Sequence, residues 1–137
     1  MLSEIIAGFP NITELHLGCA AAVPLLLRRA HPCSRARSRG RHRYCKKLTQ
    51  ESIVTIGRGC SKLTKLDISR TGVTDLSEIG RGCSKLTELD ISGTGVTDLS
   101  EIGRGCPDLE SLNLAHVHCT DISEIARGCR KLKSLCV

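Results

Sequence analysis

The sequence of 137 residues is almost without aromatic side chains: it holds one phenylalanine, one tyrosine and no tryptophan. Hydrophobic residues make up 40% of it, so a core is feasible, but that core must consist of leucine, isoleucine, valine and cysteine. Such a core suits thin structural units that leave no room for rings. The length limits the chain to one domain at most.

Targeting and membrane segments are missing too. The N-terminus does not carry a basic stretch followed by an apolar one, as a secretory signal would. The longest apolar run, residues 20–27, contains a proline and is far shorter than the roughly 20 residues that a membrane span needs. These absences predict a protein that is neither secreted nor embedded in a membrane.

Signals of catalysis and of metal binding are also absent. No nucleophile stands beside a base, there is no glycine-rich phosphate loop, and no Cys-x-x-Cys pair occurs. The segment His116-Val117-His118-Cys119 groups three metal-ligating side chains, but it lacks a fourth, and Cys119 stands where an earlier segment has Val96. We therefore expect no catalytic activity, no cofactor and no metal site.

What the sequence does contain is a repeat. Cys60, Cys83, Cys106 and Cys129 follow one another at intervals of 23 residues. The stretch that starts at Gly59 recurs almost letter for letter after one interval, and more loosely after two. A fixed period of this size is typical of a solenoid, in which similar units stack side by side.

Each unit has a strand half and a helix half. Leu63, Leu66 and Ile68 stand at fixed distances after the cysteine, and strand alternation puts Leu66 and Ile68 on one face. Leu76 and Ile79 then follow at helical spacing. The repeat therefore predicts one short strand and one short helix per unit.

The helix half carries its own start and stop signals. Asp75 and Glu78 have the spacing of a capping box, in which each side chain accepts a backbone N–H near the other residue. Gly80 and Gly82 are predicted to end the helix, and Arg81 suits the negative end of the helix dipole.

The pattern Cys-x-x-Leu-x-x-Leu-x-Leu, followed by Val-Thr-Asp and closed by Gly-Cys, resembles the cysteine-containing leucine-rich repeats. In that family such arrays form the substrate-binding horseshoe of F-box proteins, the receptors of SCF ubiquitin ligases. The resemblance implies an α/β fold: a right-handed leucine-rich repeat solenoid with parallel strands on the concave face and short helices on the convex face. It also implies a protein ligand and, through an F-box segment that this sequence does not contain, a ligase adaptor.

Stacking of the units predicts one buried column of Leu66, Leu89 and Leu112. The similarity begins inside the helix half of a unit, with Phe9 at the cysteine position, and the last strand runs into Val137. We expect the chain to be a segment of a longer horseshoe.

The cysteines indicate a reducing environment. Four of the nine keep the period of the repeat, so each would occupy the same buried place, one unit from the next. A small buried thiol fits that place better than a disulfide does. This predicts a cytoplasmic protein, with the nucleus as the alternative.

Residues 20–44 interrupt the repeat with seven arginines and no acidic side chain. The net charge of +6 depends on them, because without those arginines the chain has 13 basic and 14 acidic residues. Three interpretations stay open: a disordered functional arm, a silent loop insertion, and non-coding sequence carried into the translation. We favour the last, since the flanks rejoin in register. The chain then divides into a partial repeat (1–19), the basic insertion (20–44) and the repeats (45–137).

Functional contacts are predicted on the concave face, where side chains that alternate with the buried leucines point outward. The predicted protein-binding residues are Glu14, His16, Lys65, Asp67, Ser69, Glu88, Asp90, Ser92, Ser111 and Asn113. The same face also holds Gly18, Ala115, Ser134 and Cys136. Asp67 and Asp90 favour a basic ligand. Alternatively they are solvated strand residues, since no aromatic or arginine side chain anchors the surface.

We predict a non-catalytic protein-interaction module, the substrate-recognition part of an F-box-like ubiquitin-ligase receptor. One alternative is a surface or adhesion-type leucine-rich repeat protein, which the short units favour. Another is nucleic-acid contact through the arginines of the insertion. That contact would have no aromatic platform beyond Tyr44, so neither nucleic acid nor membrane is an expected partner.

Overall fold

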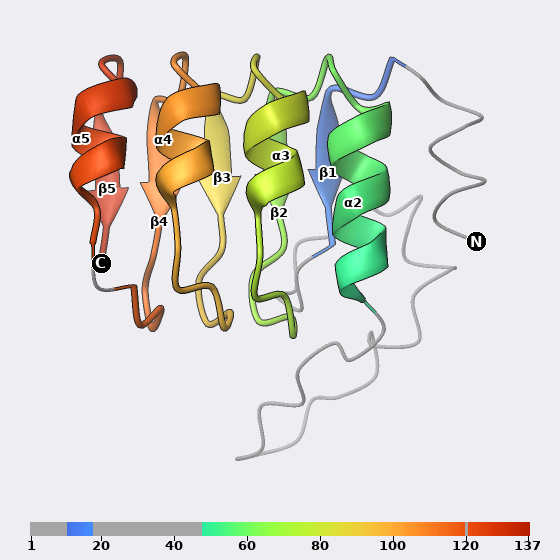
Figure 1. Ribbon diagram of the computed structural model, residues 1–137, viewed down its shortest axis with the longest axis horizontal. Coiled ribbons are helices and arrows are strands. Elements are labelled where there is room, and N and C mark those ends of the chain that lie inside the picture. Colours follow the sequence, from blue (N-terminus) through green and yellow to red (C-terminus); the bar gives the residue numbers. More distant parts are fainter. Residues whose placement is uncertain (1–10, 18–47, 120) are drawn as a thin grey trace.

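The computed structural model describes residues 11–17, 48–119 and 121–137. In this part of the chain, parallel strands form one sheet and helices cover one of its faces (Figure 1). The strands are β1 (Glu14–His16), β2 (Lys65–Asp67), β3 (Glu88–Asp90), β4 (Ser111–Asn113) and β5 (Ser134–Cys136). The helices are α2 (Gln50–Gly59), α3 (Ser77–Gly82), α4 (Ser100–Gly105) and α5 (Ser123–Gly128).

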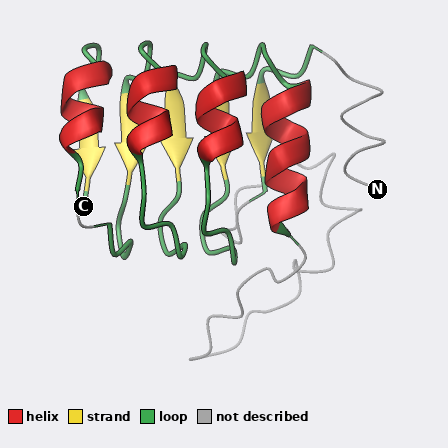
Figure 2. Cartoon of the chain, in the orientation of Figure 1, coloured by secondary structure: helices red, strands yellow, loops and turns green. Residues whose placement is uncertain are grey.

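The strands follow one another in the sheet in chain order, each paired in parallel with the next. Figure 2 shows the helices side by side along one face of the sheet. The register aligns the central leucines as direct partners: Leu15, Leu66, Leu89, Leu112 and Leu135. The inner three of these are no more than 2% exposed, so the predicted buried column is confirmed. The α/β solenoid predicted from the repeat is confirmed as well.

The core lies between the sheet and the helices, and cysteine forms one of its columns. The thiol of Cys83 donates to the backbone carbonyl of Cys60 at 3.5 Å, and that of Cys106 donates to Cys83 at 3.5 Å. Cys129 continues the series onto Cys106 at 3.4 Å. Cysteine therefore fills a thin layer without leaving its own polar atom unpaired.

Glycine allows neighbouring helices to approach each other closely. Gly80 lies inside α3, and a Cβ there would overlap the backbone carbonyl of Glu101 in α4. A Cβ on Gly105 would overlap the carbonyl oxygen of Gly80. The predicted end of the helix at Gly82 is confirmed, whereas Gly80 lies inside α3, where its missing side chain allows the next helix to approach. Equivalent contacts involve Gly57, Gly82, Gly103 and Gly128.

The helix starts differ from the predicted capping box. The carboxylate of Asp75 accepts the backbone N–H of Ser77 at 2.8 Å and its hydroxyl at 2.6 Å. These two hydrogen bonds lower the pKa of Asp75 below its ordinary value. The reciprocal half of the box is wrong: the carboxylate of Glu78 turns to the preceding helix, where the Nε of Arg58 donates to it at 3.1 Å.

That ion pair belongs to a ladder across the helices. The Nε of Arg81 donates to Glu101 at 3.4 Å, and the Nε of Arg104 donates to Glu124 at 3.3 Å. Within a helix, Nη1 of Arg81 also lies 3.6 Å from Glu78. Arginine and glutamate thus alternate from α2 to α5, and each inter-helix pair joins two neighbouring units.

Some predictions fall outside the described residues. They are the helix half at residues 2–9, the position of Gly18 and all three interpretations of the insertion at 20–44. The division of the chain into three segments stays a prediction.

Replacing Leu89 by alanine is expected to lower the free energy of unfolding by about 2–5 kcal/mol, because a large side chain is removed from the packed column. Urea denaturation followed by circular dichroism measures this. Leu135→Ala is the matched control: the same change in the same column, at a side chain that is 42% exposed, should cost less. A loss below about 0.5 kcal/mol for Leu89→Ala would contradict the stacking.

Gly80→Ala is expected to destabilise the protein by about 1–3 kcal/mol, because the added methyl forces α3 and α4 apart. Gly72→Ala provides the control, since nothing lies within 4 Å of a Cβ at Gly72. That second change should stay within about 1 kcal/mol of the parent protein. Equal effects of the two substitutions, in the same urea assay, would show that helix spacing does not depend on glycine.

Candidate functional site

The sheet has a second face, opposite the helices, which we call the open sheet face. Its side chains flank the central leucine of each strand and form two rows across the strands. The first row is Glu14, Lys65, Glu88, Ser111 and Ser134, and the second row is His16, Asp67, Asp90, Asn113 and Cys136. This is the face that the sequence predicts to be concave.

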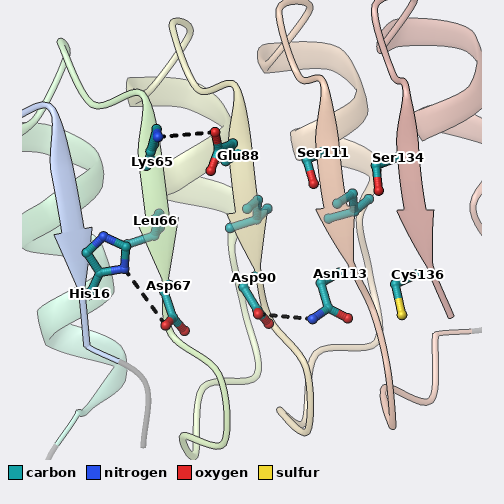
Figure 3. Close-up of a pocket in the computed structure, with 12 residues that line it drawn as sticks. His16, Lys65, Leu66, Asp67, Glu88, Asp90, Ser111, Asn113, Ser134 and Cys136 are labelled. Atoms are coloured by element: carbon teal, nitrogen blue, oxygen red, sulfur yellow. Dashed lines mark hydrogen bonds and ion pairs between the residues drawn. The ribbon is translucent and has the colours of Figure 1, made fainter. Parts of the chain in front are cut away.

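A hollow of about 370 Å³ lies on this face (Figure 3). Its lining residues come from all five strands: His16, Lys65, Leu66, Asp67, Glu88, Leu89, Asp90, Ser111, Leu112, Asn113, Ser134 and Cys136. Most of the predicted binding residues are among them. The hollow is therefore made by the in-register stacking of the units, not by a special loop.

Three of the predicted residues do not line the hollow: Glu14, Ser69 and Ser92. Conversely, the structure adds Leu66, Leu89 and Leu112, which the sequence pattern assigned to the core alone. No signal in the sequence distinguishes a core leucine whose edge reaches the surface from one that is fully enclosed. For each of these residues, contact with a protein partner stays a prediction.

Lys65 occupies the first row between two carboxylates. Its Nζ lies 3.2 Å from Glu88 on β3 and 3.6 Å from Glu14 on β1. The hydrogen bond to Glu88, followed by the charge of Glu14, raises the pKa of Lys65 above its ordinary value. Such exposed pairs contribute little to stability, but they fix the lysine and occupy both glutamates.

In the second row, Asp67 and Asp90 each use one oxygen to hold the turn that follows their strand. The Oδ1 of Asp67 accepts the backbone N–H of Ser69 at 2.9 Å, and Oδ1 of Asp90 accepts that of Ser92 at 2.9 Å. Such local bonds are typical of aspartate at a turn. They fix the orientation of both carboxylates, so the aspartates have a structural role besides any binding role.

The other oxygen of each carboxylate lies near a side chain of the strand on its far side, β1 for Asp67 and β4 for Asp90 (Figure 3). The Nδ2 of Asn113 on β4 donates to Oδ2 of Asp90 at 3.0 Å. On the opposite side, Nδ1 of His16 on β1 lies 3.9 Å from Oδ2 of Asp67. The second row therefore runs from histidine through two carboxylates to an amide.

Ser69 lies on the same side of its strand as Asp67, since Ile68 between them points into the core. The sequence places Ser69 on the exposed surface, but its side chain is only 2% exposed. Its hydroxyl oxygen is buried and has no hydrogen-bond partner among the described residues. Such unpaired buried groups are rare in proteins and call for an explanation.

The histidine–cysteine segment does not form a metal centre within the described residues, where no three metal-ligating side chains converge. His116 is exposed and has a positive φ of 61°. Cys119 is partly buried and packs against the core, as expected from its equivalence to Val96. The segment has the properties of a turn.

The family described as "Leucine Rich repeats (2 copies)" matches residues 61–104 and 84–127. Those residues contain β2, α3, β3, α4 and β4, and all of α5 except its last residue. Residues 61–127 thus match the leucine-rich repeat family, and the described part of the chain folds as a leucine-rich repeat solenoid. Nothing in the match specifies the cysteine-containing F-box subtype.

Solved structures that resemble the chain include two internalins. Internalin C2 from Listeria monocytogenes is 27% identical with a TM-score of 0.55, over 67% of this chain and 38% of the internalin chain. The internalin inlF from the same organism is 22% identical with a TM-score of 0.46, over 60% of this chain and 30% of the other. The chain thus spans well under half the length of either internalin.

No curated protein matches the sequence. Among the described helices, none combines the length and the apolar character that crossing a membrane requires.

Cysteine alkylation is expected to separate the open sheet face from the core. Burial raises the pKa of Cys83 and of Cys106 to about 12, so their thiols stay protonated and enclosed at neutral pH. Cys136 is exposed and lines the hollow. Iodoacetamide should modify Cys136 in the folded protein and the other two only in urea, as read by peptide mass spectrometry. Equal rates in the folded protein would contradict this burial.

Proposed function

We propose that the protein is a non-catalytic protein-interaction module that binds its partner on the open sheet face. The single observation that carries the proposal is the hollow of about 370 Å³, lined from all five strands by polar side chains above a leucine floor. Leucine-rich repeat proteins are typically binding modules. A uniform surface of stacked units offers recognition groups at regular spacing and no convergent catalytic group.

Two cellular settings compete, and different observations support each. Buried free cysteines in the described part support a reducing compartment, the cytoplasm or nucleus, where an F-box-type substrate receptor of a ubiquitin ligase would act. The similarity to internalin C2 supports the surface or adhesion-type alternative at least as well. Neither internalin is described as an F-box protein, so ligase function rests on the sequence resemblance alone.

Contact with nucleic acid through the arginines at 20–44 stays a hypothesis, because those residues lie outside the described part. The hollow in the described part is lined by Asp67, Glu88 and Asp90 and by one lysine, Lys65, so it is not a basic groove of the kind that binds phosphates.

Ser111→Arg is expected to reduce partner capture by about tenfold or more, because a long charged side chain fills the hollow. The measurement is affinity capture from the native cell, with the captured proteins quantified by mass spectrometry against the parent protein. Loss of a cytoplasmic or nuclear protein would support the receptor setting. Loss of an extracellular or cell-surface protein would support the adhesion setting.

Ser84→Arg is the matched control, since it adds the same side chain at an exposed turn away from the open sheet face. It should leave capture unchanged, and circular dichroism should show both variants folded. If Ser111→Arg retains all partners, the open sheet face is not the binding site.

A further inference from the structure

The turns that follow β2, β3 and β4 each contain one residue in the left-handed backbone conformation. Its φ is 55° at Arg70, 65° at Gly93 and 61° at His116, and these positions are 23 residues apart. The turns lie side by side at the edge of the sheet where the strands end (Figure 1). Glycine adopts this conformation freely, whereas a long side chain is strained in it. Arg70 therefore keeps a strain that the next unit avoids, and such strain is typical of functional positions.

Gly93 gives the side chain of Arg70 a surface to lie on. A Cβ at Gly93 would lie 3.3 Å from Cγ of Arg70 and 3.8 Å from its Cα. The stem of the arginine thus lies close against the bare backbone of the next turn. The backbone N–H of Arg70 also donates to the carbonyl of Ser92 at 2.7 Å, which ties the two turns together. Arginine in one turn and glycine in the next therefore form a complementary pair that holds the stem.

The guanidinium of Arg70 has no carboxylate partner within the described part. The side chain is exposed and makes no ion pair with any residue there. Each arginine of the helices, in contrast, pairs with a glutamate: Arg58, Arg81, Arg104 and Arg127. An exposed guanidinium is well solvated, so its lack of a partner alone indicates nothing. A strained backbone that presents this guanidinium on a supported stem is a different matter, because the fold gains no ion pair from it.

Arg70 lies at the rim of the open sheet face. It directly follows Ser69, whose backbone N–H is bonded to the carboxylate of Asp67 in the second row. Asp67 lines the hollow, whereas Arg70 stands just beyond it, in the turn at the end of β2. A partner that occupies the hollow and extends past the end of β2 contacts this guanidinium.

We propose that Arg70 is a specificity-determining residue of the partner interface and binds a carboxylate of the protein that the open sheet face binds. The proposal rests on the function proposed above and adds the chemistry of one contact. A guanidinium and a carboxylate match in two parallel N–H···O bonds. Because Gly93 supports the stem, less side-chain freedom is lost on binding. Arginine is also one of the residue types that dominate the binding energy of protein interfaces.

The charge of the hollow determines where the partner's carboxylate lies. Three carboxylates, those of Asp67, Glu88 and Asp90, line the hollow beside one lysine. An acidic side chain of the partner is therefore repelled from the hollow and attracted to the rim, where Arg70 stands. Attraction at one place and repulsion at the next are the two means by which interfaces select a binding mode. The contact thus fixes the direction in which the partner lies across the strands.

The test uses as its probe the protein that the parent chain captures and Ser111→Arg loses, purified for calorimetric titration. Arg70→Gly should weaken its binding by about tenfold, because the guanidinium is lost. The variant gives the turn the residue that the next unit has, so its urea midpoint should equal or exceed that of the parent. Unchanged affinity would overturn the proposal. A lower midpoint would make Arg70 a structural residue and overturn it too.

Arg130→Gly is the matched control. It removes the same side chain from an exposed turn before β5, at the opposite end of the strands. This variant should bind the probe as the parent does. Equal losses in Arg70→Gly and Arg130→Gly would reduce the effect to net charge and would contradict a contact at the rim.

The carboxylate itself is identified by cross-linking. A carbodiimide couples an amine to a carboxylate in direct contact, and it does not couple a guanidinium. Arg70→Lys should therefore form an amide bond between the introduced amine and a carboxylate of the probe, as read by peptide mass spectrometry. Arg130→Lys should form none from its introduced amine. If no link from position 70 forms in the complex, the partner chemistry proposed here is wrong.

The role of Gly93 has its own test. Gly93→Ala should weaken binding in the parent chain, because the added methyl displaces the arginine stem. In the Arg70→Gly background it should cause no further loss, since the residue that it acts through is gone. Additive losses would show that Gly93 does not act through the arginine.

Failure of this inference is distinguishable from failure of the proposed function. If Arg70→Gly keeps full affinity while Ser111→Arg still abolishes capture, the open sheet face binds its partner without this contact. If Ser111→Arg loses no captured protein, the proposed function fails, and this inference fails with it.

Discussion

The contact on which the described structure depends is between backbones, not side chains. Gly80 and its equivalents meet a carbonyl group of a neighbouring helix where any Cβ would overlap it. Because the helices can approach so closely, units of only 23 residues keep their strands in register on the other side of the core. A methyl group at this position would spread the helices while the strands remained tied by hydrogen bonds. The glycines thus keep the spacing of the helices compatible with the spacing of the hydrogen-bonded strands.

The open sheet face follows from this regularity, and its chemistry from departures within it. Every strand presents two outward positions around a buried leucine, so the backbone alone offers a uniform grid. In the first row, β1 and β3 carry glutamate, β2 carries Lys65, and β4 and β5 carry serine. The row therefore has a charged part over β1 to β3 and an uncharged part over β4 and β5. The chemistry of this face therefore depends on a few residue differences at equivalent positions, and the fold supplies only their spacing.

The period, the strands and the leucine column could all be predicted from the sequence, because each rests on spacing within one unit. What failed depends on contacts between units. Glu78 has the spacing of a capping residue, yet its carboxylate accepts a hydrogen bond from Arg58, twenty residues earlier in the chain and on the preceding helix. Gly80 has the local features of a helix end, yet it is a contact point for Glu101. On the candidate site, outward side chains followed from alternation, whereas the burial of Ser69 and the pairing of Lys65 depend on neighbouring strands.

The ladder of arginine and glutamate across α2 to α5 bears on how the solenoid responds to its surroundings. In a linear array, overall stability separates into the intrinsic stability of each unit and the coupling between neighbours. Each inter-helix pair of the ladder contributes only to the coupling, and salt screens exposed charges. Ionic strength therefore acts on the distance over which the units behave cooperatively. Added salt would leave each unit's own core unchanged and let one end of the stack open with less effect on the other.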